Sequence, residues 1–163
     1  GDTYTTEAWI TDAVDDAFKN SIPLWGRLTE NETKSDKLYE AIISGDQKHI
    51  DRIKGQFEDQ KDIDAAIRKG LRENDSRIQE ATMASMTGSG SERIKIQKEI
   101  IKEGHFKQDY VVEATNAEVN YVRTKINEAK EYAEKGKEDK FDEIYDSLLD
   151  RGYTKAFLDK IMK

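Results

Sequence analysis

A pattern of apolar positions recurs three times along the chain, each time after a glycine: Gly45, Gly88 and Gly136. The eighth residue after each glycine is isoleucine and the twelfth is a large apolar residue; these positions are Ile53, Phe57, Ile96, Ile100, Ile144 and Leu148. The glycines are separated by 43 and 48 residues. Repeats of this period are typical of stacked helical units that bury their apolar faces against one another. The pattern therefore predicts an array of about three helical repeats.

Each anchor glycine is expected to end a helix. Before Gly45, the apolar residues Leu38, Ala41 and Ile42 have the spacing of one helical stripe. Glycine readily takes the left-handed conformation that closes many helices. After the glycine we expect an antiparallel hairpin of two helices, so that each repeat is a linking helix followed by a hairpin. Asp46 is the candidate N-cap of the first helix after Gly45.

Small and polar residues mark other helix ends. Ser76 with Gln79, and Ser89 with Glu92, have the spacing of capping boxes. Residues 87–91, with the sequence TGSGS, are the best candidate for a flexible joint. By contrast, residues 116–134 contain neither glycine nor proline and keep their apolar positions in helical register. This region predicts one long continuous helix near residues 109–134.

A separate N-terminal segment, residues 1–33, precedes the repeats. Residues 6–19 have an apolar stripe, which predicts an amphipathic helix that caps the array, and Pro23 follows where this helix breaks. The repeat region, residues 34–163, divides into units at about 35–74, 75–120 and 121–163. Because the chain has one proline and few alternating polar and apolar runs, the predicted fold class is all-α.

The charge balance limits the classes of partner. The 163 residues carry a net charge of −7, and 37% of them are charged. This balance disfavours a nucleic-acid partner, since a polyanion needs a basic surface. The exception is one helix face with Lys95, Lys98 and Lys102, which are candidate anion contacts. Interleaved glutamates, including Glu99 and Glu103, favour a solvated face with internal ion pairs instead.

The sequence contains no pattern typical of a catalytic, cofactor or metal site. There is no cysteine, and neither His49 nor His105 has a second histidine at helical ligand spacing. The glycines near residues 88–91 lack the lysine and hydroxyl residue of a nucleotide-binding loop. No apolar run approaches the roughly 20 residues that cross a bilayer. We therefore expect a soluble protein without a membrane span, and not an enzyme.

Aromatic side chains are the candidate contacts for a protein partner. Tyr110, Tyr121 and Tyr132 recur every eleven residues, which places them on one side of the predicted long helix. They form either a partner surface or part of the packing between repeats, and the second interpretation is favoured. Trp9 and Trp25 have the same two interpretations, as plugs at the end of the array or as exposed anchors.

Several strings give the repeat region a family resemblance: DKLYEAI at residues 36–42, SGD at 44–46, IRKGLRENDSRI at 67–78 and SERI at 91–94. Residues 35–163, about four fifths of the chain, resemble the helical repeat regions of large multidomain (polyvalent) proteins encoded by bacteriophages and integrated mobile elements. In those regions a Ser/Asn-Gly-Asp turn recurs between short helices, and no catalytic motif is present.

The resemblance implies a segment of a larger phage or mobile-element protein. We expect a non-catalytic structural or protein-interaction module, with an unidentified protein partner and no cofactor. Its expected location is the virion or the bacterial cytoplasm. The alternative is an accessory domain that binds nucleic acid through the basic helix face.

Overall fold

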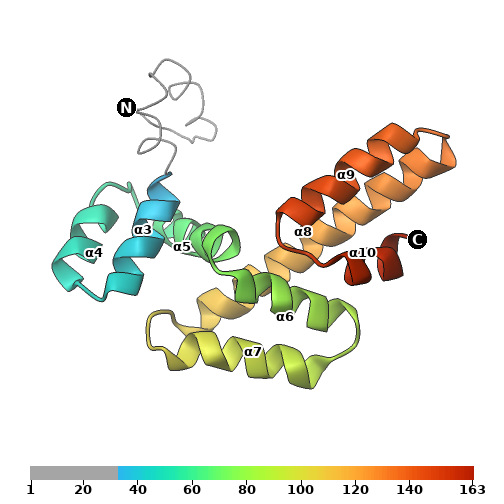
Figure 1. Cartoon of the computed structure of the whole chain (residues 1–163). Helices are drawn as coiled ribbons and strands as arrows, with labels where there is room; N and C mark the ends of the chain where they lie inside the picture. Colours follow the sequence, from blue (N-terminus) through green and yellow to red (C-terminus); the bar gives the residue numbers. More distant parts are fainter. Residues whose placement is uncertain (1–32) are drawn as a thin grey trace, which may run out of the picture. The chain divides into compact units, whose positions relative to one another are not determined.

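The computed structural model describes residues 33–163, and every regular element in this range is an α-helix (Figure 1). The helices are α3 (Lys34–Ser44), α4 (Gln47–Lys54), α5 (Gln60–Asn74), α6 (Ser76–Met86), α7 (Gly90–Lys102), α8 (Gln108–Glu134), α9 (Glu138–Asp150) and α10 (Lys155–Met162). The all-α prediction is confirmed for this range. The predicted helix at 6–19, with Trp9, and the segment around Trp25 lie outside the described residues.

The anchor glycines lie in the turns of helical hairpins. Gly45, Gly88 and Gly136 have φ values of 74°, 82° and 75°, so each takes the expected left-handed conformation. The helices on either side of each glycine pack together, as α3 with α4, α6 with α7 and α8 with α9 (Figure 1). We expected each glycine to precede a hairpin, and this prediction was wrong. Each glycine instead lies in the turn of a hairpin, between the two helices that pack together. A turn of two or three residues reverses the chain at once, which brings the flanking helices side by side.

The chain divides into two compact units, and the division lies between Ile67 and Arg68, within α5. In the first unit, α3 and α4 bury Leu38, Ala41, Ile42, Ile50 and Ile53. The predicted stripe of α4 extended to Phe57, but α4 ends at Lys54. Phe57 follows it in the turn, where the Lys34 ammonium lies 5.8 Å from the ring centroid.

The helix caps of the two units differ. In the first unit, Thr33 forms a capping box with Asp36 and the Asp46 side chain accepts bonds from two backbone N–H groups, as expected for Asp46. In the second unit, both predicted capping boxes were wrong. Asp75, the residue before Ser76, caps α6. Ser89 makes no side-chain cap bond at α7.

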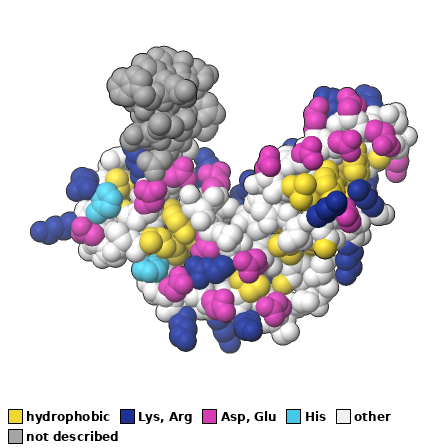
Figure 2. All heavy atoms as spheres, viewed as in Figure 1, with side chains coloured by type: hydrophobic (Ala, Val, Ile, Leu, Met, Phe, Trp, Pro, Cys, Tyr) yellow, Lys and Arg dark blue, Asp and Glu magenta, His cyan; other side chains and the backbone are white. Residues whose placement is uncertain are grey.

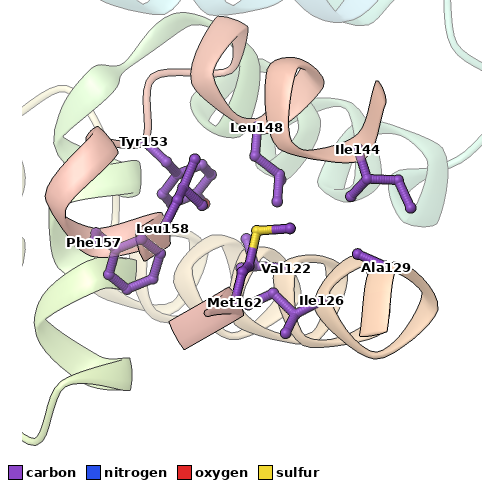
Figure 3. Packing of buried hydrophobic residues seen from close by; sticks show 9 residues of the cluster. All are labelled: Val122, Ile126, Ala129, Ile144, Leu148, Tyr153, Phe157, Leu158 and Met162. Carbon is purple, nitrogen blue, oxygen red and sulfur yellow. The ribbon is translucent and has the colours of Figure 1, made fainter. Parts of the chain in front are cut away.

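The long helix is confirmed: α8 has 27 residues without a break. Its buried stripe comprises Val111, Ala114, Thr115, Glu118, Val119, Val122, Ile126 and Ala129. The C-terminal half of α8 packs on α9 and α10 around an apolar cluster that includes Leu148, Phe157 and Met162 (Figure 3). On α10 the buried residues are Phe157, Leu158 and Met162.

A polar contact explains the break that Arg93 makes in the apolar stripe of α7. The Arg93 guanidinium donates to Gln97 Oε1 at 2.9 Å. Gln97 is buried and donates in turn to Thr115 Oγ1 of α8 at 3.0 Å. The amide of Gln97 therefore has partners for both its oxygen and its nitrogen, as a buried polar group requires.

Candidate functional site

One acidic residue lies on the apolar stripe of the long helix. Glu118 is fully buried, one helical turn from Ala114 on one side and from Val122 on the other. Because the stripe faces the neighbouring helices, the carboxylate is directed into the second unit and away from solvent. A buried charge of this kind is costly unless hydrogen bonds and an opposite charge compensate it.

Four side chains from other segments donate hydrogen bonds to this carboxylate. Arg72 Nε of α5 donates to Oε1 at 2.9 Å, and Gln79 Nε2 of α6 donates to Oε2 at 3.3 Å. Arg151, which follows α9, binds both oxygens, through Nε at 2.5 Å and Nη2 at 2.8 Å. The Tyr153 hydroxyl donates to Oε2 at 2.7 Å. We call these five residues the Glu118 network.

The network keeps Glu118 ionised. Burial alone would raise the pKa of its carboxyl, but hydrogen bonds from Arg151, Tyr153 and Arg72 outweigh burial and lower that pKa to about 2. Burial and the adjacent carboxylate raise the pKa of Tyr153, so its hydroxyl keeps its proton. The contact with Glu118 likewise raises the pKa of Arg151. The network therefore holds an ionised carboxylate against the Arg151 guanidinium.

Tyr121 lies one turn after Glu118 and is surrounded by cations. The Arg151 guanidinium carbon lies 4.4 Å from its ring centroid, and that of Arg72 lies 6.0 Å away. The Lys125 ammonium lies 5.8 Å from the same centroid. Attraction between each cation and the ring adds to the carboxylate contacts that hold the two arginines.

A cavity of about 420 Å³ opens beside this cluster within the second unit. Its lining residues are Arg72, Glu73, Tyr121, Ser147, Asp150 and Arg151. Both arginines of the Glu118 network are partly exposed, each with 24% of its side chain accessible. The cavity therefore gives solvent access to the cations while the carboxylate between them stays covered.

The predicted aromatic contacts lie in different surroundings. Tyr121 and Tyr132 are partly buried against the apolar cluster of α8, α9 and α10. Tyr110 is also partly buried, in the first turn of α8. The structure therefore brings Tyr121 to the cavity and leaves the other two tyrosines away from its lining.

The predicted basic face lies on α7, where Lys95, Lys98 and Lys102 are all exposed. The expected internal ion pairs on this face were wrong. Among the described residues these lysines form no ion pair, and Glu103 instead pairs with Arg77 of α6 at 2.8 Å. Arg77 also contacts Asp75. Glu103 therefore links the end of α7 to the start of α6.

Residues 33–163 contain a histidine contact, but no cluster of metal ligands and no helix able to span a membrane. His49 contacts Arg52 on the same helix, and no group of three or more His, Cys, Asp or Glu side chains in residues 33–163 is arranged to hold a metal ion. None of the helices between residues 33 and 163 has the length and apolar character needed to cross a bilayer.

The Glu118 network is not among the features predicted from the sequence, although one signal for it is present there. Glu118 falls in register with Ala114 and Val122 on a stripe that is otherwise mostly apolar. A charged residue in a buried register indicates a buried partner. Its main partners, Arg72 and Arg151, are 46 and 33 residues away, so sequence spacing could not identify them.

Searches against protein-family models, curated proteins and solved structures find no match to this chain.

Proposed function

We propose that this chain is a non-catalytic scaffold, a structural or protein-interaction module of a larger phage or mobile-element protein. The proposal includes three helical repeats, at about residues 35–74, 75–120 and 121–163, capped by an N-terminal helix. The observation that carries it is the Glu118 network, in which a fully buried carboxylate accepts hydrogen bonds from side chains of other segments. Such a network fixes the relative positions of helices, which is what a scaffold requires.

The same carboxylate is poorly suited to acid–base chemistry. A general acid or base works best when its pKa is near the working pH and when it can reach the substrate. The pKa of Glu118 is lowered to about 2, and its side chain has no exposed surface. The ion pair therefore supports a role in holding the fold.

Apolar side chains at the surface favour contact with a partner protein over a role limited to packing within the chain. Ile43 and Ile94 have 38% and 43% of their surface exposed. Apolar side chains also reach the surface of the α8–α9 hairpin, where charged groups border them (Figure 2). Apolar contacts within a charged border are typical of protein interfaces.

Site-specific photocross-linking tests this proposal. A photoreactive phenylalanine analogue would replace Ile43 or Ile94 in the full chain, produced in cells that carry the encoding phage or element. We expect one defined protein product at one of these positions, and none at the exposed control position Asp62 on α5. Mass spectrometry of purified virions tests virion association. Absence of a defined product at both isoleucines, or turnover of a substrate by the purified chain, would contradict the proposal.

A second candidate function is nucleic-acid binding through α7. It is favoured because Lys95, Lys98 and Lys102 are exposed and have no ion-pair partner in the described range. Against it, acidic and basic side chains are mixed over the face of α7 seen in Figure 2. Filter binding of DNA and RNA over a salt series tests it. Binding that is lost when the three lysines become glutamine would establish this function, and no binding at low salt would exclude it.

A further inference from the structure

The cavity beside the Glu118 network is lined by two arginines with unused hydrogen-bond donors. Among its contacts with described residues, Arg72 donates only through Nε, and Arg151 only through Nε and Nη2. Both terminal nitrogens of Arg72 and Nη1 of Arg151 are therefore available. Since both arginines line the cavity, these donors are accessible to a ligand there.

The two arginines of the cavity share one buried carboxylate. Arg72 donates to Oε1 of Glu118, and Arg151 donates to both of its oxygens. Guanidinium groups bind planar carboxylates through paired N–H donors, so the donors that Glu118 leaves unused suit a second carboxylate. Because Glu73 and Asp150 also line the cavity, its lining combines both signs of charge.

The acidic part of the lining favours a particular kind of carboxylate. Glu73 and Asp150 line the same cavity, and Asp150 has no ion-pair partner in the described range. Asp150 would repel a dianion such as phosphate, but would attract a cationic group beside the ligand carboxylate. The Tyr121 ring provides an apolar wall for the methylene groups of a side chain. Taken together, the lining fits a glutamate or aspartate side chain with a basic neighbour.

We propose that this cavity is the docking site for an acidic side chain of a partner protein, bound by Arg72 and Arg151 and flanked by a lysine or arginine. This inference rests on the proposed interaction function and names the partner chemistry of one site. Glu118 acts as a positioning residue, because it holds the two guanidinium groups without reaching the ligand.

Nuclear magnetic resonance of the full chain tests the site directly. The Nε–Hε signals of Arg72 and Arg151 report on the two guanidinium groups. The probes are the peptides acetyl-Lys-Glu-Lys-amide and acetyl-Lys-Gln-Lys-amide, with inorganic phosphate at matched ionic strength. We expect saturable shifts with the glutamate peptide and binding weaker by about tenfold or more with the glutamine peptide. Non-specific attraction to this acidic chain would favour the more cationic glutamine peptide, which is the opposite order.

A pair of matched variants separates the site from the fold. Ser147 lines the cavity, is exposed on α9, and its hydroxyl bonds only to the Ile144 carbonyl of its own helix. Ser147→Leu should place an apolar side chain in the cavity, leave the Glu118 network intact and weaken binding of the glutamate peptide by about tenfold or more. Ser91→Leu, at an exposed position of α7 outside the cavity, should bind as the unmodified chain does.

Three results would overturn the inference. These are equal affinity for the two peptides, tighter binding of phosphate than of the glutamate peptide, and unchanged binding in Ser147→Leu. If any of them occurs while cross-linking at Ile43 or Ile94 captures a defined protein, the proposed function stands and only this site is wrong. If cross-linking finds no protein, the proposed function itself fails.

Discussion

The α3–α4 and α8–α9 hairpins have the same kind of connection, but different interactions hold their helices. Each turn is short and contains a left-handed glycine, Gly45 or Gly136. In the first hairpin both helices begin at a side-chain cap. In the second hairpin neither α8 nor α9 has one. There the Glu118 network links α8 to α5, α6 and the turn after α9.

The difference shows two ways of stabilising similar local geometry. A cap satisfies backbone N–H groups within a few residues of itself, so its effect is local and moderate. A buried carboxylate with distant donors links several segments, and its loss leaves other buried groups without partners. We therefore expect substitutions in the second hairpin to have larger and more widespread effects than those in the first.

Glu118→Gln should have the largest effect. It removes the charge that both arginines need and should lower the free energy of unfolding by about 3–5 kcal/mol. Chemical denaturation measures the loss, and hydrogen exchange should locate it in residues 68–163.

Glu113→Gln is the matched control, because Glu113 also lies on α8 and pairs with an arginine of α5, Arg68, at 3.1 Å. That pair is exposed, so its loss should cost less than about 1 kcal/mol. Equal effects of the two substitutions would contradict the special role of the buried network.

Acid should weaken the second unit through the same carboxylate. The pKa of Glu118 is lowered to about 2 in the folded state, whereas that of an unfolded glutamate is about 4.3. A lowered pKa stabilises the fold above the unfolded value, and this contribution is lost as pH falls from about 4.3 to 2. It amounts to about 3 kcal/mol. Denaturation over this pH range should show the loss, and Glu118→Gln should lack this component of it.

Tyr153→Phe should have an intermediate effect. It removes one donor to the buried carboxylate and keeps the ring that stacks on Phe157. Loss of a hydrogen bond to a charged group should cost about 1.5–3 kcal/mol in thermal or chemical unfolding. Tyr145→Phe, which removes a bond to Asp159 at the protein surface, is the control and should cost less. Equal costs of the two changes would show that burial of the acceptor carboxylate does not strengthen the Tyr153 bond.

Asp46→Ala should have the smallest of these effects. It removes the carboxylate that caps α4 by accepting hydrogen bonds from the N–H groups of Lys48 and His49. The loss should lower the free energy of unfolding by about 1 kcal/mol. Hydrogen exchange should detect fraying at the start of α4. Ser89→Ala, at a position without a cap bond, should leave the start of α7 unchanged. Fraying of α7 in that variant would show that Ser89 does act as a cap.

The sequence predicted features that depend on local patterns. The long helix α8 follows from a stretch without breakers, and the helix ends at Gly45, Gly88 and Gly136 follow from glycines that can take positive φ. Which helices pair around these glycines was predicted wrongly. The capping boxes at Ser76 and Ser89 failed although their spacing was right. Asp75, one residue earlier, takes the cap position at α6, and Gln79 points instead to the carbonyl of Arg72 and to Glu118. The capping box at Ser76 therefore failed because Asp75 takes the cap position and Gln79 has other hydrogen-bond partners.

The candidate site could be predicted only in part. The position of Glu118 on an apolar stripe is visible in the sequence, but its partners depend on how α5, α6 and the turn after α9 pack around α8. Tyr121 was a candidate because of its spacing along the helix. Its role beside two arginines depends on tertiary structure.

The order of the donors along the chain has a consequence for biosynthesis. Arg72 and Gln79 leave the ribosome before Glu118, whereas Arg151 and Tyr153 follow it by 33 and 35 residues. When the nascent chain has reached the end of α8, only Arg72 and Gln79 can donate to the Glu118 carboxylate. Because contacts that are distant in sequence close late, the Glu118 network can close only after the turn that holds Arg151 and Tyr153 has been made.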